Sequence, residues 1–186
     1  MANLLHILKL KTCILIFSLL TSQIILSQSE TYLTKNGNIQ ISTIINGKVI
    51  NAYSHKLIIQ LDYSNALIKL YLDKSTLETD NDSLKQIINS FGGLTIEANG
   101  KLGVSFIETK MHPQQNFNVY LGFTKGLVGQ HFQGQGTLTH LEGRLACLLK
   151  MNFQLKLDSN QLIPYFKEPE INIRILQTLL KKSTDK

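Results

Sequence analysis

The sequence has no tryptophan, two cysteines and three prolines, and only 17% of its 186 residues are charged. Two cysteines exclude a disulfide-stabilised scaffold, because such domains depend on several cysteine pairs. Three prolines and 12 glycines exclude collagen-like and low-complexity chains. The hydrophobic fraction of 43% is sufficient for a packed core and too high for a disordered chain. We therefore expect one ordinary folded domain.

A short apolar segment near the N-terminus predicts an export signal. Two lysines precede the run Cys13–Leu20 without an acidic residue, and the small residues Ser27 and Ser29 follow it. This order of basic, apolar and small residues is typical of a secretory signal peptide. The alternative is a membrane anchor or a buried helix, but a bilayer span needs about 20 continuous apolar residues, and this run is shorter and interrupted. We expect residues 1–27 to be removed, leaving 28–186 as a periplasmic or secreted domain.

The predicted mature chain has a small net charge and a single thiol. Removing the two lysines of the signal lowers the formal net charge from +6 to +4. The remaining basic residues are scattered, so the sequence predicts no nucleic-acid partner. Cys147 is then alone and cannot form an intrachain disulfide, and the absence of cysteine near the cleavage region argues against a lipid anchor.

The dominant hydrophobic period in the rest of the chain is two. Its clearest case is Leu145–Leu157, where every odd position is apolar and the even positions from Lys150 onward are polar. Side chains of a strand alternate across a sheet, so this segment predicts a long strand with one buried face.

Shorter alternating sets predict further strands, with antiparallel neighbours joined by tight turns. The sets fall within residues 39–45, 57–63, 68–72, 102–106, 117–123 and 171–175. Asn36-Gly37, Asn46-Gly47 and Asn99-Gly100 are dipeptides that favour hairpin turns, because both residue types tolerate a positive φ.

One segment has helical spacing instead. Asp82–Phe91 places four apolar residues on one face, begins with an acid that is able to cap it, and is followed by Gly92-Gly93. Seven or eight strands and one short amphipathic helix predict an all-β, closed antiparallel β-barrel, with the helix against the open end or outer face. A two-sheet sandwich is the alternative.

No residue pattern indicates catalysis or a metal site. The histidines of the predicted domain are His55, His112, His131 and His140. They lack both the paired spacing of a zinc site and neighbouring cysteines. The glycines near His131 lack the lysine and helix of a phosphate loop, so we interpret Gly129, Gly134 and Gly136 as turn glycines. Cys147 falls on the apolar face of the long strand, where burial makes a thiol inert. We expect no enzyme, no cofactor and no metal.

Three segments carry a resemblance to a known family. Tyr32–Asp62, with paired strands and a short turn, resembles the opening of YceI-like domains, and Gly134–Arg144 is similar to their Gly-x-Leu-Thr segment. His112–Phe117 is similar to their proline-then-phenylalanine strand entry. The sequence departs from the family at residues 140–143, where Gly-Val-Thr is usual. The resemblance implies a secreted or periplasmic eight-stranded lipocalin-like barrel that holds a long hydrophobic molecule, in some members a polyisoprenoid.

The same function follows from the physics of an apolar barrel interior. An eight-stranded barrel is at the size where its interior is either filled by side chains or holds one ligand. We expect a non-catalytic barrel whose partner is a hydrophobic, isoprenoid or lipid-like small molecule. The interior positions expected to contact it are Phe106, Phe117, Leu121, Phe123, Leu149, Met151 and Phe153.

Two other functions remain open at this stage. The first is a solid-core barrel that acts as a structural or protein-interaction module. The second is an outer-membrane barrel, which has the same dyad pattern. The absence of tryptophan for an interfacial girdle and the charged end of the sequence argue against the second, so we expect no stable membrane insertion.

Overall fold

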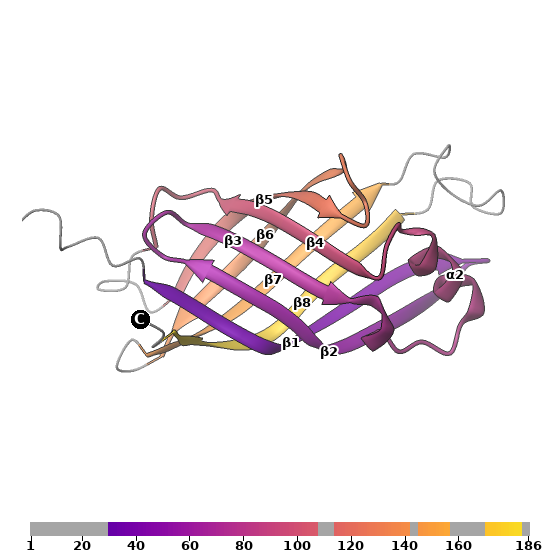
Figure 1. The fold of residues 1–186 in the computed structure, drawn as a ribbon, viewed down its shortest axis with the longest axis horizontal. Coiled ribbons are helices and arrows are strands. Elements are labelled where there is room, and N and C mark those ends of the chain that lie inside the picture. The colour runs from indigo at the N-terminus through magenta and orange to yellow at the C-terminus, as the bar shows by residue number, and fades with distance from the viewer. Residues whose placement is uncertain (1–29, 108–113, 142–144, 157–169, 184–186) are drawn as a thin grey trace, which may run out of the picture.

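The chain forms a closed antiparallel barrel of eight strands in a computed structural model that describes residues 30–107, 114–141, 145–156 and 170–183. Each strand pairs with the next in sequence, and the last pairs back to the first (Figure 1). The strands are β1 (Thr31–Ile45), β2 (Lys48–Asp62), β3 (Leu67–Asp73), β4 (Thr95–Leu102), β5 (Gln114–Lys125), β6 (His131–His140), β7 (Ala146–Lys156) and β8 (Glu170–Lys182). The predicted all-β, lipocalin-like barrel is confirmed. The sandwich is wrong, because the pairing of β1 with β8 leaves no second sheet.

The strand predicted from residues 145–157 is β7. Its inward side chains Cys147, Leu149, Met151, Phe153 and Leu155 are at most 4% exposed. Period-two alternation therefore predicted the buried face correctly. The prediction fails at its first residue, since Leu145 is 69% exposed and precedes the strand.

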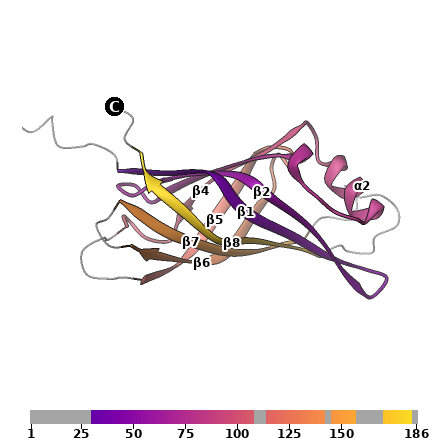
Figure 2. The ribbon, with the colours of Figure 1, turned by 90° about the horizontal axis from the view of Figure 1, so that it is seen from below.

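A 3-10 turn, η2 (Lys74–Thr76), and one helix, α2 (Asp82–Ser90), connect β3 to β4. Leu84, Ile87 and Ile88 form the buried face of α2, as the spacing predicted. The cap is Asn81 instead of Asp82, because the Asn81 Oδ1 accepts a hydrogen bond from the Leu84 N–H at 2.9 Å. Figure 2 shows α2 at one end of the barrel, beside the β1–β2 hairpin. This end is called the helix end below.

Only one of the three predicted Asn-Gly turns is a turn. Asn46-Gly47 joins β1 to β2 with φ of 52° and 74°, the positive values that such a hairpin needs. Asn36-Gly37 lies inside β1 at a register shift, so it forms a bulge. Asn99-Gly100 lies inside β4, paired with β3 and β5. Both of these turn predictions are wrong, because the pairing of neighbouring strands overrides the local preference.

The predicted signal peptide lies outside the described residues. Among the residues that are described, no helix is long and apolar enough to cross a bilayer.

Candidate functional site

The barrel interior contains an apolar cavity of about 50 Å³ in the half toward the helix end. Every strand contributes to its lining. Strands β5, β6 and β7 each contribute one phenylalanine, and all strands except β5 and β6 contribute aliphatic side chains. The lining residues are Ile39, Ile41, Leu57, Leu70, Leu72, Phe91, Ile96, Ala98, Phe123, Leu127, Phe132, Phe153, Leu155, Ile171, Ile173 and Ile175. Every one of them is apolar, so the cavity offers a ligand no hydrogen bond.

The opposite half of the barrel is filled by side chains. Phe117, Leu121, Leu149 and Met151 are all buried there, and none of them lines the cavity. The Phe117 ring lies directly over Gly136, since a Cβ at Gly136 would come within 2.5 Å of it. The interpretation of Gly134 and Gly136 as turn glycines is therefore wrong, because both lie inside β6, and at Gly136 the missing side chain makes room for a ring. Gly129 does lie in the turn between β5 and β6, with a φ of 84°.

The structure separates the seven predicted contact residues into three groups. Phe123 and Phe153 line the cavity. The four residues of the filled half are interior but do not line it, although Leu121 and Met151 are cross-strand partners of lining residues. Phe106 is 56% exposed, so its predicted interior position is wrong. The physical reason is that β4 ends at Leu102, and alternation no longer determines the direction of a side chain beyond a strand end.

Phe132 is an important lining residue that the sequence prediction missed. Its ring packs edge-on against Phe123 at 4.5 Å and against Phe153 at 5.4 Å between ring centroids. The three rings thus form one aromatic wall of the cavity. The sequence contains a signal for it, because Phe132 and Leu138 are inward residues of one strand at an even spacing, but the glycines between them favour turns over a strand.

Phe91 and Leu127 bound the cavity at the helix end, and the backbone of Phe91 is held by a partly buried cation. Phe91 directly follows α2. The Lys74 ammonium donates hydrogen bonds to the carbonyl oxygens of Ile88, at 3.4 Å, and of Phe91. A cation at the C-terminal end of a helix is favourable because the last carbonyls carry negative partial charge. Partial burial lowers the pKa of Lys74. The two hydrogen bonds of its ammonium group hold the end of α2 next to the cavity.

A polar cluster lies at the filled end, far along the strands from the cavity. The Tyr32 and Tyr63 rings stack with their centroids 3.9 Å apart, and the His140 ring packs edge-on against Tyr63 with centroids 5.6 Å apart.

The buried thiol of Cys147 lies next to this cluster. Burial raises the pKa of the Cys147 thiol to about 11, while its hydrogen bond with the Tyr63 hydroxyl lowers that pKa. A protonated, buried thiol is a poor nucleophile. In the part of the chain that the structure describes, no three metal-ligating side chains gather.

Comparison with known proteins relates this chain to others by structure alone. No protein-family model and no curated protein sequence matches it. A polyisoprenoid binding domain from Saccharophagus degradans, implicated in plant cell wall breakdown, is similar in structure with a TM-score of 0.58 and 6% identity, over 84% of this chain and 100% of that one. BcnA of Burkholderia cenocepacia is similar with a TM-score of 0.50 and 8% identity, over 78% and 96%. At these identities the similarity shows the fold.

Proposed function

We propose that this protein is a carrier that holds the apolar chain of a lipid-like or isoprenoid molecule in the helix-end half of its barrel. The observation that carries the proposal is the continuous apolar lining of the cavity, to which no polar side chain contributes. Removing a chain from water into such a lining is favourable by about 0.8 kcal/mol per CH₂. Binding of this kind needs no catalytic group.

The cavity of about 50 Å³ is the resting space and must widen to admit a chain. It is only a few times the volume of about 10–15 Å³ that one water molecule needs. The side chains able to give way are those at the helix end, because Phe91 and Leu127 belong to connections and not to strands. The filled half, with Met151 and Leu149 fully buried, limits how far a chain penetrates.

The fold comparison supports the ligand class. One of the similar structures is a polyisoprenoid binding domain, and the match covers the whole of that domain. From this similarity we propose that the ligand is an isoprenoid or similar chain and that the protein is a YceI-like domain. Export to the periplasm or the exterior is a separate proposal, which rests on the predicted signal peptide.

Two alternatives are less well supported. A solid-core module describes only the filled half, since the other half contains the cavity. An outer-membrane barrel presents an apolar band to lipid and a polar interior. Here Lys69, Gln135 and Asn152 are exposed on the outer wall, and the buried residues are apolar except for Thr43, Ser54 and Thr178.

The test is lipid binding by the purified protein. Mass spectrometry of an organic extract from native protein is expected to recover an apolar chain molecule. Farnesol or decanoic acid added to delipidated protein is then expected to raise its thermal midpoint, because a ligand that binds only the folded state stabilises it.

A pair of variants makes the result specific to the cavity. Ala98 lines the cavity and is 3% exposed, so Ala98→Leu is expected to occupy the space and weaken binding by at least about tenfold, or about 1.4 kcal/mol. Met151→Leu is the matched control, a volume-conserving change in the filled half. An empty native extract together with no stabilisation by either chain molecule would overturn the carrier proposal.

A further inference from the structure

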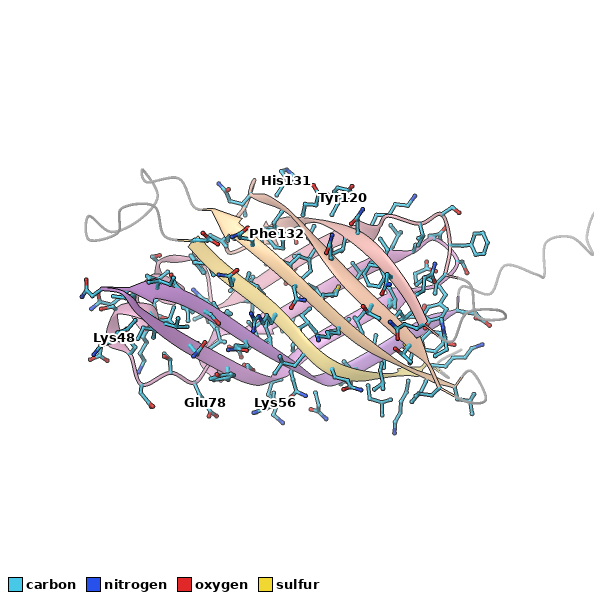
Figure 3. All side chains as sticks on the ribbon, turned by 180° about the vertical axis from the view of Figure 1, so that it is seen from behind. Lys48, Lys56, Glu78, Tyr120, His131 and Phe132 are labelled. Atoms are coloured by element: carbon cyan, nitrogen blue, oxygen red, sulfur yellow. The ribbon has the colours of Figure 1, made fainter. Side chains whose placement is uncertain are left out.

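The outer wall of the barrel carries a second feature that the carrier function does not use. Amide, hydroxyl and basic side chains form two cross-strand rows over β5, β6, β7 and β8. One row pairs Asn116 with Thr137 and Thr137 with Lys150. The other runs from Asn118 through Gln135 and Asn152 to Arg174. These strands cross the front of Figure 3, where β7 is orange and β8 is yellow.

The rows lie in two adjoining depressions of the surface. A depression of about 530 Å³ lies over β5, β6 and β7, and one of about 550 Å³ lies over β7 and β8. Lys150 and Asn152 line both, so they join the two into one trough. Four neighbouring strands span about 14 Å, which gives the trough the length of a short oligomer.

The charges of the trough have one sign. Strands β5, β6 and β7 contain no acidic residue, and β8 has only its first residue, Glu170. Glu170 is four residues from Arg174 along the strand, a separation of about 13 Å. Among the described residues, neither Lys150 nor Arg174 forms an ion pair. The trough therefore complements an anion.

Three uncharged amide side chains of the trough are also available for hydrogen bonds to a ligand. Thr137 donates a hydrogen bond to Asn116 at 3.1 Å. The side chains of Asn118, Gln135 and Asn152 make no side-chain hydrogen bond within the described part of the chain. An amide both donates and accepts, which suits the hydroxyl groups of a sugar.

We propose that this trough binds an acidic saccharide, with Lys150 and Arg174 facing its carboxylates or sulfates and the three amides facing its hydroxyls. A nucleic acid fits less well. Phosphate-backbone binding depends on many cations, whereas the two rows contain two. Single strands also need aromatic platforms for their bases, but the two phenylalanines that line the trough, Phe117 and Phe153, are at most 7% exposed. The trough is on the outer wall, so a ligand bound there does not occupy the barrel cavity.

The test measures binding of a panel of hexasaccharides to the full chain. Oligogalacturonate, oligoalginate, hyaluronan and chondroitin sulfate represent the acidic class, and maltohexaose represents the neutral class. We expect at least one acidic member to bind at least about tenfold more tightly than maltohexaose, with the affinity falling as salt is raised. No detectable binding of any acidic member would overturn the proposal.

Exposed substitutions then locate the site. Lys150→Ala with Arg174→Ala is expected to lose at least about tenfold in affinity. Lys69→Ala with Lys101→Ala removes the same charge from the outer wall of β3 and β4 and is expected to bind as the parent does. Equal losses in the two double variants would show unspecific charge attraction and refute the site.

Two further measurements separate a saccharide site from other anion sites. Asn118→Ala with Asn152→Ala keeps the charge and is expected to weaken acidic saccharides by at least about threefold. Unchanged affinity in this variant would refute recognition of hydroxyls. Tighter binding of a single-stranded oligonucleotide than of every saccharide, lost in the Lys150→Ala, Arg174→Ala variant, would assign the trough to nucleic acid and overturn the proposal.

Discussion

Truncating one leucine in each half of the barrel is expected to give two different outcomes, because only one half contains the cavity. Leu72 is 3% exposed and lines the cavity. Leu149 is fully buried and lies in the filled half. Leucine-to-alanine changes in cores cost about 2.7–5.0 kcal/mol, rising by about 24 cal/mol per Å³ of new cavity. Leu72 already faces empty space and so has fewer contacts to lose.

We therefore expect Leu72→Ala to lower the free energy of unfolding by about 2–3 kcal/mol and Leu149→Ala by about 4–5 kcal/mol. Equilibrium unfolding in urea measures both values, with an unchanged dependence on denaturant as the sign that the unfolded states are comparable. A loss at Leu72 equal to or larger than that at Leu149 would refute the division of the interior into two halves.

The same pair of variants tests whether the cavity is where a chain binds. Decanoic acid at a hundredfold excess over its dissociation constant stabilises a folded binder by about 2.7 kcal/mol, which raises the thermal midpoint of a domain of this size by about 5–10 °C. The space opened by Leu72→Ala joins the cavity, so its shift is expected to exceed that of the parent. The space opened by Leu149→Ala is separated from the cavity by Met151, so its shift should match the parent. A thermal-midpoint shift larger in Leu149→Ala than in the parent would indicate that the ligand binds in the filled half, which would refute the assignment of the cavity as the binding site.

Three further predictions concern the helix end and the buried thiol. Lys74→Met removes the contacts to the end of α2, so stopped-flow release of a bound fluorescent fatty acid is expected to be several-fold faster; an unchanged rate would exclude Phe91 as the moving boundary. Asn81→Ala removes the cap of α2 and is expected to cost about 1 kcal/mol in urea unfolding, with Asn81→Asp near neutral. Because the Cys147 pKa is raised in the folded state from 9.0 to about 11, the stability it contributes is complete below about pH 9 and is lost as the pH approaches 11. Urea midpoints across this range should therefore fall more in the parent than in Cys147→Ala, and an equal fall would refute the assignment.

The strands and the buried faces were predictable because each depends on a pattern within a few residues. Alternation identified β7 and its inward side chains, and helical spacing identified α2. The closure of the barrel was also predictable in outline, since closure removes every exposed sheet edge, although the alternation alone did not distinguish a barrel from a two-sheet sandwich. What the alternation does not contain is the position of each strand end, and Phe106 was assigned to the interior for that reason.

The local turn signals were less reliable than the alternation. Asn99-Gly100 and Gly136 carry the residue types of turns, yet both lie in strands. In each strand the glycine allows close approach: a Cβ at Gly100 would meet the Tyr120 backbone oxygen at 2.0 Å, and one at Gly136 would meet the Phe117 ring. Such contacts join residues far apart in sequence, so no local rule distinguishes a glycine of this kind from a turn glycine.

The location of the cavity follows from which inward positions are large. An eight-stranded barrel is just wide enough for side chains to fill it. In one half, rings and long side chains fill the interior, and the Phe117 ring occupies the space over Gly136. Toward the helix end Ala98 is an inward residue without a side chain that reaches the opposite wall. The rings of Phe123, Phe132 and Phe153 pack on one another there instead of crossing the interior. A single small residue and one aromatic wall thus keep the space open, which is why Ala98→Leu is expected to close it while leaving the barrel folded.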